Sequence, residues 1–194
     1  MNRASLRGLS REFCAVSILQ RLFGGSHAQD DLRPLYEAAV AEGRDPAWYL
    51  AGGVPDTIDG RFDVIASVVS LILLRFEADG DAARTHGVML TERFIEDMDG
   101  QLREIGIGDV VVGKHMGKMM GALGGRLGAY RSGLAGEGDA GEGNLHGAVR
   151  RNIFRDAAPS EEAVAFVAER LRRLHAGLAA TPLEQLLRAE LPRP

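Results

Sequence analysis

The sequence has little cysteine and little lysine. Of its 194 residues only Cys14 is a cysteine, so neither an internal disulfide framework nor a cysteine-rich zinc site can form. A single cysteine also fits a reducing compartment. Only Lys114 and Lys118 are lysines among the 23 basic residues. This arginine bias, together with 25 glycines, is typical of a GC-rich bacterial genome.

No apolar run is long enough to span a membrane. The most apolar stretch, Val64–Leu74, is interrupted by Ser67 and Ser70. As a helix it would be about 16 Å long, whereas the hydrocarbon core of a bilayer is about 30 Å thick. We therefore expect this stretch to be a buried core helix. With 45% hydrophobic and 26% charged residues, the chain suits one ordinary globular domain.

The net charge of −4 is unevenly distributed. Residues 1–28 carry a net charge of +3, residues 29–109 a net charge of −10, and residues 110–194 a net charge of +3. Because there is no overall basic surface, direct binding of nucleic acid is not expected. The acidic middle region is either a solvated surface or a contact for a basic partner.

The N-terminal segment is rich in arginine. Arg3, Arg7 and Arg11 precede the first acid, Glu12, and no continuous apolar stretch marks a secretory signal. We predict that residues 1–25 form a basic amphipathic helix that packs on the protein. A helix lying on an anionic membrane surface and a mitochondrial transit peptide are the alternatives.

Hydrophobic periodicity and capping signals predict an all-α protein, a single compact domain of about eight helices. The helix over about 57–77 is apolar on nearly all sides, which is typical of a central helix. We expect a helical core over residues 30–156 and a helical extension over 160–194 that packs on it. The other expected helices are residues 4–23, 30–42, 46–50, 82–104, 110–134, 144–155 and 160–178, with a short one opened by a capping box at Thr181–Glu184.

Most motifs of enzymes are missing. There is no G-x-S-x-G and no P-loop, and no two histidines stand at a helical spacing of three or four. The acids Glu96, Asp97, Asp99 and Glu104 cluster, so a metal-assisted hydrolase using residues 96–109 is one alternative function. We favour helix caps and ion pairs with neighbouring arginines for these acids, and expect neither a metal nor a catalytic residue.

Glycine recurs every four residues along the predicted helix 110–134, at Gly113, Gly117, Gly121 and Gly125. Each glycine costs a helix about 1 kcal/mol relative to alanine. Such a stripe allows another backbone to approach closely. The neighbour is either a helix of the same chain, which we favour, or a helix of a partner. Self-association through the stripe is a further alternative function.

Methionines flank the glycine stripe, and methionine adapts to varied apolar partners. We therefore predict a surface here that accepts an apolar protein client. Its candidate residues are Met116, Met119, Met120, Leu123, Arg126 and Tyr130.

Three strings of sequence resemble one known family. They are YEAAVAEGRDPAWYLAGGVPDTIDGRFD (36–63), FIEDMDGQLREIGIGD (94–109) and VGKHMGKMMGALGGRLGAY (112–130), followed by RNIF at 151–154. Over residues 34–155 the sequence is similar to the ubiquinol–cytochrome c chaperones, which assist assembly of the cytochrome bc complex. Gly124 departs from the family pattern, which has a bulky aromatic residue there.

The resemblance implies an all-α assembly chaperone without a cofactor or catalytic activity. It implies binding to cytochrome b or another subunit of the complex, and by analogy to a small partner protein and the ribosome. A bacterial member would be cytoplasmic with peripheral contact to the inner membrane, and a eukaryotic member would lie on the matrix side.

The charged residues of these strings predict a polar junction between helices. We expect Arg61 to pair with Asp97, Asp99 or Glu104, with Arg103 and Arg126 acting likewise. The junction is either purely structural or borders the client surface. Its predicted members are Asp56, Asp59, Arg61, Asp63, Asp97, Asp99, Arg103, Glu104 and Asp109.

Overall fold

The structure is a computed structural model that describes residues 31–104, 109–136, 144–155 and 157–194. Side chains at 101–104, at 109–116 and at 118 lie outside this description. Every regular element in the described residues is a helix, which confirms the predicted all-α class. The predicted N-terminal helix over residues 1–25 falls outside the described residues, and Leu32–Pro194 forms one compact unit.

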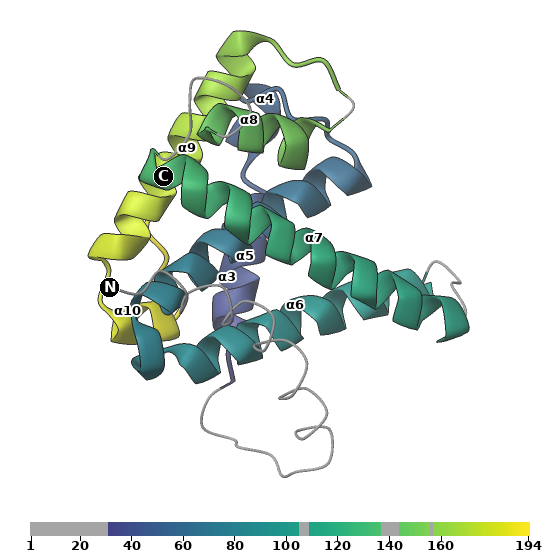
Figure 1. Cartoon of the computed structure of the whole chain (residues 1–194), viewed down its shortest axis with the longest axis vertical. Helices are drawn as coiled ribbons and strands as arrows, with labels where there is room; N and C mark the ends of the chain where they lie inside the picture. Colours follow the sequence, from purple (N-terminus) through teal and green to yellow (C-terminus); the bar gives the residue numbers. More distant parts are fainter. Residues whose placement is uncertain (1–30, 105–108, 137–143, 156) are drawn as a thin grey trace, which may run out of the picture. The chain divides into compact units, whose positions relative to one another are not determined.

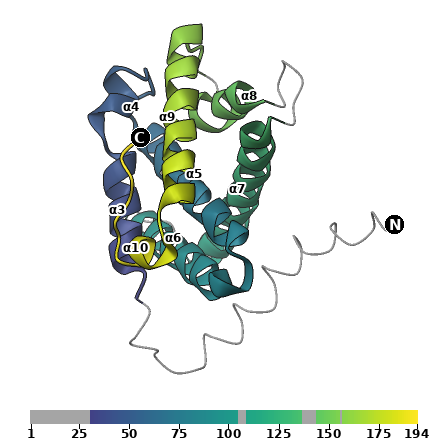
Figure 2. The same ribbon diagram turned by 90° about the vertical axis from the view of Figure 1, so that its left-hand side faces the viewer.

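Helix α5 (Ile58–Ala78) lies at the centre of this unit, as its apolar pattern predicts (Figures 1 and 2). From Val64 to Leu74 every residue is buried. The hydroxyls of Ser67 and Ser70 donate to the backbone carbonyls four residues earlier, each over 2.7 Å. Two serines can therefore sit inside the apolar helix, because neither leaves a polar group unpaired.

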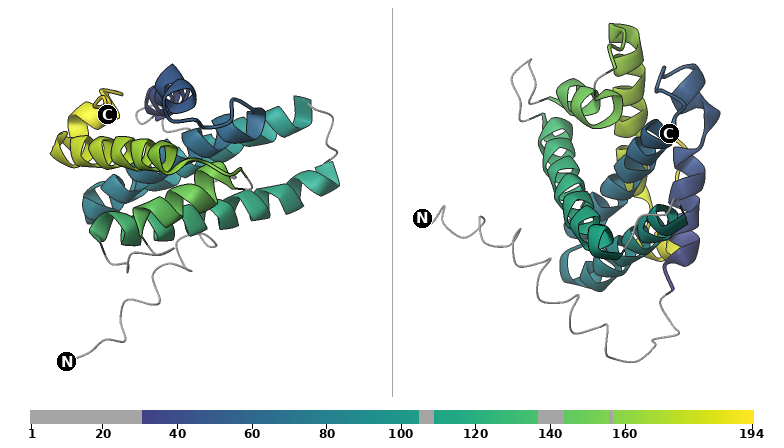
Figure 3. Two further views of the ribbon diagram at one scale, coloured as in Figure 1. Left: turned by 90° about the horizontal axis from the view of Figure 1, so that it is seen from above. Right: turned by 90° about the vertical axis from the view of Figure 1, so that its right-hand side faces the viewer.

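Four long helices pack around α5, and the views along different axes in Figures 2 and 3 show them on different sides of it. They are α3 (Arg33–Gly43), α6 (Arg84–Glu104), α7 (Asp109–Ala135) and α9 (Glu161–Ala180). The shorter elements are α4 (Pro46–Leu50), the 3-10 helix η1 (Gly80–Ala82), α8 (Leu145–Val149), the π-helix η2 (Arg150–Phe154) and α10 (Leu183–Leu187).

Several predicted helix starts are confirmed. Asp45 caps α4 through the backbone N–H of Ala47, Thr57 caps α5 through Gly60, and Ser160 caps α9. The predicted capping box at Thr181 is wrong. Thr181 instead ends α9, where its hydroxyl donates to the carbonyl of Gly177, because the preceding helix continues as far as Ala180.

The predicted helix over 144–155 differs from the structure in its second half. It begins as the α-helix α8, capped by Asn144, and then widens into the π-helix η2. The structure ends η2 at Arg155, whose φ of 49° and ψ of −111° are rare for a residue with a side chain. Helical periodicity does not signal such a widening, whereas π-helical turns are frequent at functional sites.

No helix among the described residues is long and apolar enough to cross a bilayer. This agrees with the reading of Val64–Leu74 as a core helix.

Candidate functional site

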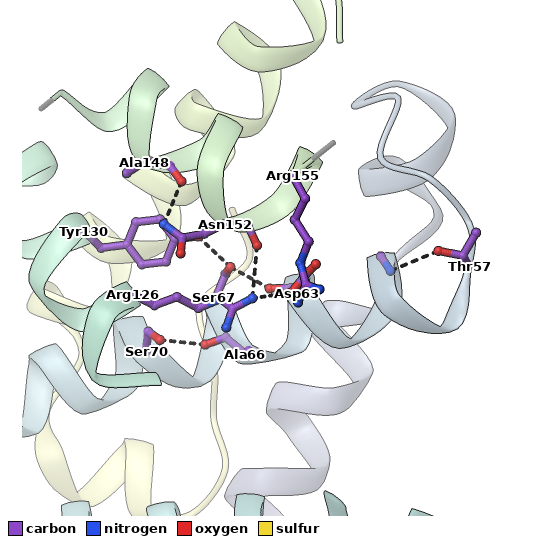
Figure 4. Close-up of polar contacts among 11 residues, drawn as sticks. Thr57, Asp63, Ala66, Ser67, Ser70, Arg126, Tyr130, Ala148, Asn152 and Arg155 are labelled. Atoms are coloured by element: carbon purple, nitrogen blue, oxygen red, sulfur yellow. Dashed lines mark hydrogen bonds and ion pairs between the residues drawn. The ribbon is translucent and has the colours of Figure 1, made fainter. Parts of the chain in front are cut away.

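A buried ion cluster joins α5, α7 and η2. Asp63 of α5 is only 1% exposed and forms ion pairs with Arg126 of α7 and with Arg155 at the end of η2 (Figure 4). The Arg155 contact is 2.5 Å long, and Arg126 also donates to the carbonyl of Asn152 over 3.2 Å. Arg126 and Arg155 lie 63 and 92 positions after Asp63 in the sequence, so these contacts join three distant segments at one carboxylate.

Two hydroxyls extend the cluster along α5. The oxygens of Ser67 and Tyr130 lie 2.6 Å apart, and both side chains are buried. Because the hydrogen of Ser67 is donated to the carbonyl of Asp63, Tyr130 must be the donor in this pair. Burial raises the pKa of Tyr130 to about 12, so it holds its proton at physiological pH.

The cluster contains two guanidinium groups for one carboxylate. Burial raises the pKa of the Asp63 carboxyl, and the positive charges of Arg126 and Arg155 oppose this rise. Burial also lowers the pKa of Arg126, and the charge of Asp63 opposes that change. Since an unpaired buried charge is costly, each partner depends on the other for its place in the core.

Arg155 allows a direct test of the backbone strain beside this cluster. Arg155→Ala and Arg155→Gly both remove the ion pair with Asp63, but only glycine adopts φ of 49° without a steric penalty. We expect the glycine variant to be more stable than the alanine variant by about 1–3 kcal/mol. Urea unfolding followed by circular dichroism measures the difference. Equal stabilities would show that the backbone at this position is not strained in solution.

The predicted polar junction is split among separate places. Arg61 donates to Asp56 over 2.6 and 3.2 Å at the exposed start of α5, so its predicted pairing with acids of α6 is wrong. The cause is local, since Asp56 precedes the helix and lies within reach of the Arg61 side chain. Asp59 is exposed in the first turn of the same helix.

Asp97 of α6 takes part in a different contact. It accepts a hydrogen bond of 2.7 Å from the hydroxyl of Tyr36 on α3. Asp99 also lies on α6, while the side chains of Arg103, Glu104 and Asp109 fall outside the described residues. Among the predicted residues whose side chains are described, Asp63 and Arg126 are the two that meet in the buried cluster.

The predicted client contacts on α7 need a correction. Leu123, Arg126 and Tyr130 are buried within the unit, so they cannot contact a client unless the core opens. Met119 and Met120 are partly buried against the same core. The side chain of Met116 lies outside the description. In the described part of α7, this apolar and methionine-rich side therefore faces inward.

The glycines of α7 lie on its other side. A helix turns about 100° per residue, which places Gly117, Gly121 and Gly125 away from Leu123 and Tyr130. A Cβ atom built at any of these three glycines meets no atom of the described residues within 4 Å. The same is true of two more glycines on this side, Gly124 and Gly128.

Within the described residues no helix of the same chain packs on these glycines. A neighbouring helix from the same chain, which we favour, and a partner helix both remain predictions. Gly113 lies outside the description.

Sequence reasoning missed Arg155, Ser67 and Asn152 as parts of the cluster. Arg155 directly follows the string RNIF, so its charge was a visible signal. The two serines inside an otherwise apolar helix were another, because a buried hydroxyl needs a partner. Nothing in the sequence links these signals to Asp63, which lies 92 positions before Arg155.

The fold is thus an all-α bundle with a buried central helix and an ion cluster that joins three of its elements. The family model of the ubiquinol-cytochrome C chaperones matches residues 50–193, so the chain belongs to that family. The match reaches further toward the C-terminus than the similarity over 34–155 and includes α9 and α10.

A solved structure of similar fold agrees with this assignment. The crystal structure of the Cbp3 homolog from Brucella abortus superposes with a TM-score of 0.70 at 29% sequence identity. The match covers 82% of this chain and 86% of that chain. A comparison with curated proteins gave no significant match.

Proposed function

We propose that this protein is an assembly chaperone that binds cytochrome b, or another subunit of ubiquinol–cytochrome c reductase, before the subunit joins the complex. The observation that carries the proposal is the family match over residues 50–193. The protein acts by binding and not by catalysis.

Leu123, Arg126 and Tyr130 are buried, so the part of the proposed client surface still open to a client is the outward, glycine-rich side of α7. At five glycines an added Cβ would meet no described residue within 4 Å, so the backbone of α7 is open there to close approach by another helix. These glycines weaken α7, and packing within the described chain does not offset that cost. A helix of the client or of a small partner protein would offset it.

The acidic region 29–109 supports a basic client. Its net charge of −10 complements the Lys- and Arg-rich loops that membrane proteins present to the cytoplasm. Such attraction weakens with salt, so we expect client binding to weaken as ionic strength rises. The proposed location is the cytoplasm, with peripheral contact to the inner membrane, and the proposed further partners are the ribosome and a small partner protein.

A deletion strain tests the function. We expect its membranes to lose the cytochrome b signal in reduced-minus-oxidised spectra, and immunoblots to show less cytochrome b. The wild-type gene should restore both. The physical reason is that an apolar subunit without its chaperone aggregates or is degraded before assembly. Normal cytochrome b in the deletion strain would refute the proposed function.

A further inference from the structure

Three large apolar side chains in the described residues stand out to solvent: Leu50 is 86% exposed, Ile58 82% and Phe166 37%. All three border the loop of residues 51–57. Leu50 ends α4 before it, Ile58 begins α5 after it, and a Cβ built on Gly52 would lie 3.2 Å from the ring of Phe166. Large exposed apolar groups that gather in one place mark interaction surfaces.

The backbone of this loop is held in place on both sides. A Cβ on Gly52 would overlap the carbonyl oxygen of Trp48, and one on Gly60 would overlap that of Pro55. The hydroxyl oxygen of Thr57 accepts the N–H of Gly60 over 3.1 Å. Leu50 and Ile58 are therefore exposed at the two ends of a loop whose backbone is held in place, and their exposure does not come from a loosely packed loop.

The helix that holds Leu50 is anchored as well. The ring nitrogen of Trp48 donates to the carbonyl of Glu42 over 2.9 Å, and the guanidinium of Arg170 stacks 4.6 Å above the same ring. Arg170 in turn bonds to Glu42 and Asp45. Contacts among α3, α4 and α9 thus hold the helix that contains Leu50 in place.

Ile58 has no visible role in the fold. Other residues between positions 55 and 63 have a structural role. Asp56 pairs with Arg61, and Thr57 caps the helix. Gly60 allows the close turn, and Asp63 forms the buried cluster. Ile58 sits in the first turn of α5 with its side chain in water. Neither the cap nor the core needs a large apolar residue there.

Two exposed carboxylates lie close in the sequence to two of these apolar side chains. Asp59 follows Ile58 directly, and Glu162 lies one turn before Phe166 on α9; both are exposed. The charge of Asp56 is matched by Arg61. The basic residue Arg44 precedes α4, whereas Leu50 stands at the opposite end of that helix. The surroundings are therefore acidic on balance and complement a segment that combines apolar and basic residues.

We propose that Leu50, Ile58 and Phe166, with the carboxylates of Asp59 and Glu162, dock an apolar, Lys- or Arg-rich extramembrane segment of the membrane-protein client. This rests on the proposed function and names a contact for it outside α7. Cytoplasmic loops of membrane proteins carry an excess of lysine and arginine, which is the chemistry that this surface fits. The apolar residues anchor the segment, and the carboxylates select its charge.

Site-specific photo-crosslinking of the full chain in cells tests the docking surface. The photoreactive residue p-benzoylphenylalanine replaces Ile58, Phe166 or, as a control, the exposed Glu37 of α3. We expect Ile58 and Phe166 to crosslink to a subunit of the cytochrome bc complex, within a Lys- or Arg-rich segment mapped by mass spectrometry. We expect the Glu37 position to give no such product.

Substitutions give an independent readout. Leu50→Asp with Ile58→Asp should reduce the amount of that subunit co-purified at least tenfold, and Asp59→Lys with Glu162→Lys should reduce it through charge. The melting temperature of the Leu50→Asp, Ile58→Asp variant should change by no more than about 2 °C, since both side chains are exposed. Asp59 and Glu162 lie in the first turns of α5 and α9, where lysine also opposes the helix dipole, so the lysine variant is compared with the wild-type protein at a temperature where both are folded. Unchanged co-purification would overturn the proposal.

The outcomes separate this inference from the proposed function. Crosslinks to a second copy of the chain, to lipid or to an unrelated protein would overturn the docking surface. So would equal crosslinking of the bc subunit from Glu37. If cytochrome b is lost in the deletion strain but Ile58 captures no bc subunit, the docking inference fails and the function stands. If cytochrome b is normal and nothing is captured, both fail.

Discussion

Replacing Asp63 by asparagine is expected to lower the free energy of unfolding by about 3–5 kcal/mol. The substitution keeps the size of the side chain but removes the negative charge on which Arg126 depends. Arg126 would then be a buried charge without its carboxylate, since its side chain is only 4% exposed. Urea unfolding followed by circular dichroism measures the loss, which is a large part of the stability of a typical domain.

Asp59→Asn is the matched control, because Asp59 is the neighbouring acid one turn earlier and is exposed. We expect it to lower stability by no more than about 1 kcal/mol, because Asp59 is an exposed acid in the first turn of α5. Adding Arg126→Met to Asp63→Asn should restore part of the loss, since the unpaired charge is then gone as well. Equal effects of Asp63→Asn and Asp59→Asn would refute the assigned role of the cluster.

The second large expected effect is a gain in stability. Gly121→Ala combined with Gly125→Ala is expected to raise the free energy of unfolding by about 2 kcal/mol, roughly 1 kcal/mol for each residue. The new methyl groups enter open space, and alanine restricts the unfolded chain more than glycine does. The melting temperature should rise by about 4–8 °C, measured by differential scanning calorimetry.

Gly133→Ala in the same helix is the matched control, because its Cβ would lie 2.8 Å from the backbone of Leu145. We expect this substitution to lower the stability. A loss of stability in the Gly121 and Gly125 variant would mean that the outward side of α7 is already covered in solution, as it would be in a self-associated form. Size-exclusion chromatography distinguishes that case.

Larger residues at the same sites separate folding from binding. In Gly121→Leu the new Cβ meets no described atom within 4 Å, and leucine favours a helix more than glycine does, so the melting temperature should not fall. If a client or partner helix packs on this side of α7, the variant should nevertheless fail to restore cytochrome b in the deletion strain. Full restoration would show that the glycine side is not a binding surface.

Local signals in the sequence were sufficient for several helix starts and for the central place of α5. Thr57 and Ser160 begin helices where their side chains cap the backbone, and the apolar residues on nearly all sides of α5 correctly predict its central place. These features depend on residues within a few positions of each other, so a single sequence contains the information.

The orientation of α7 could not be predicted in this way. Periodicity separates the glycine side from the side with Leu123 and Tyr130, but both sides are plausible contact surfaces. The buried side also contains Arg126, whose charge favours an exposed position unless its partner is known. That partner, Asp63, lies 63 positions earlier and is found only when the chain folds.

The arrangement of α5 and α9 has a consequence for the synthesis of this protein. Arg75 on α5 donates to the carbonyl of Leu178 near the end of α9 over 2.8 Å, a closure across 103 positions. At 5–20 residues per second, about 5–20 s pass between completion of α5 and completion of α9. During that interval the most apolar helix of the protein has no α9 to cover it. While it is being made, this chaperone therefore exposes an apolar helix to the cell, as its proposed client does before assembly.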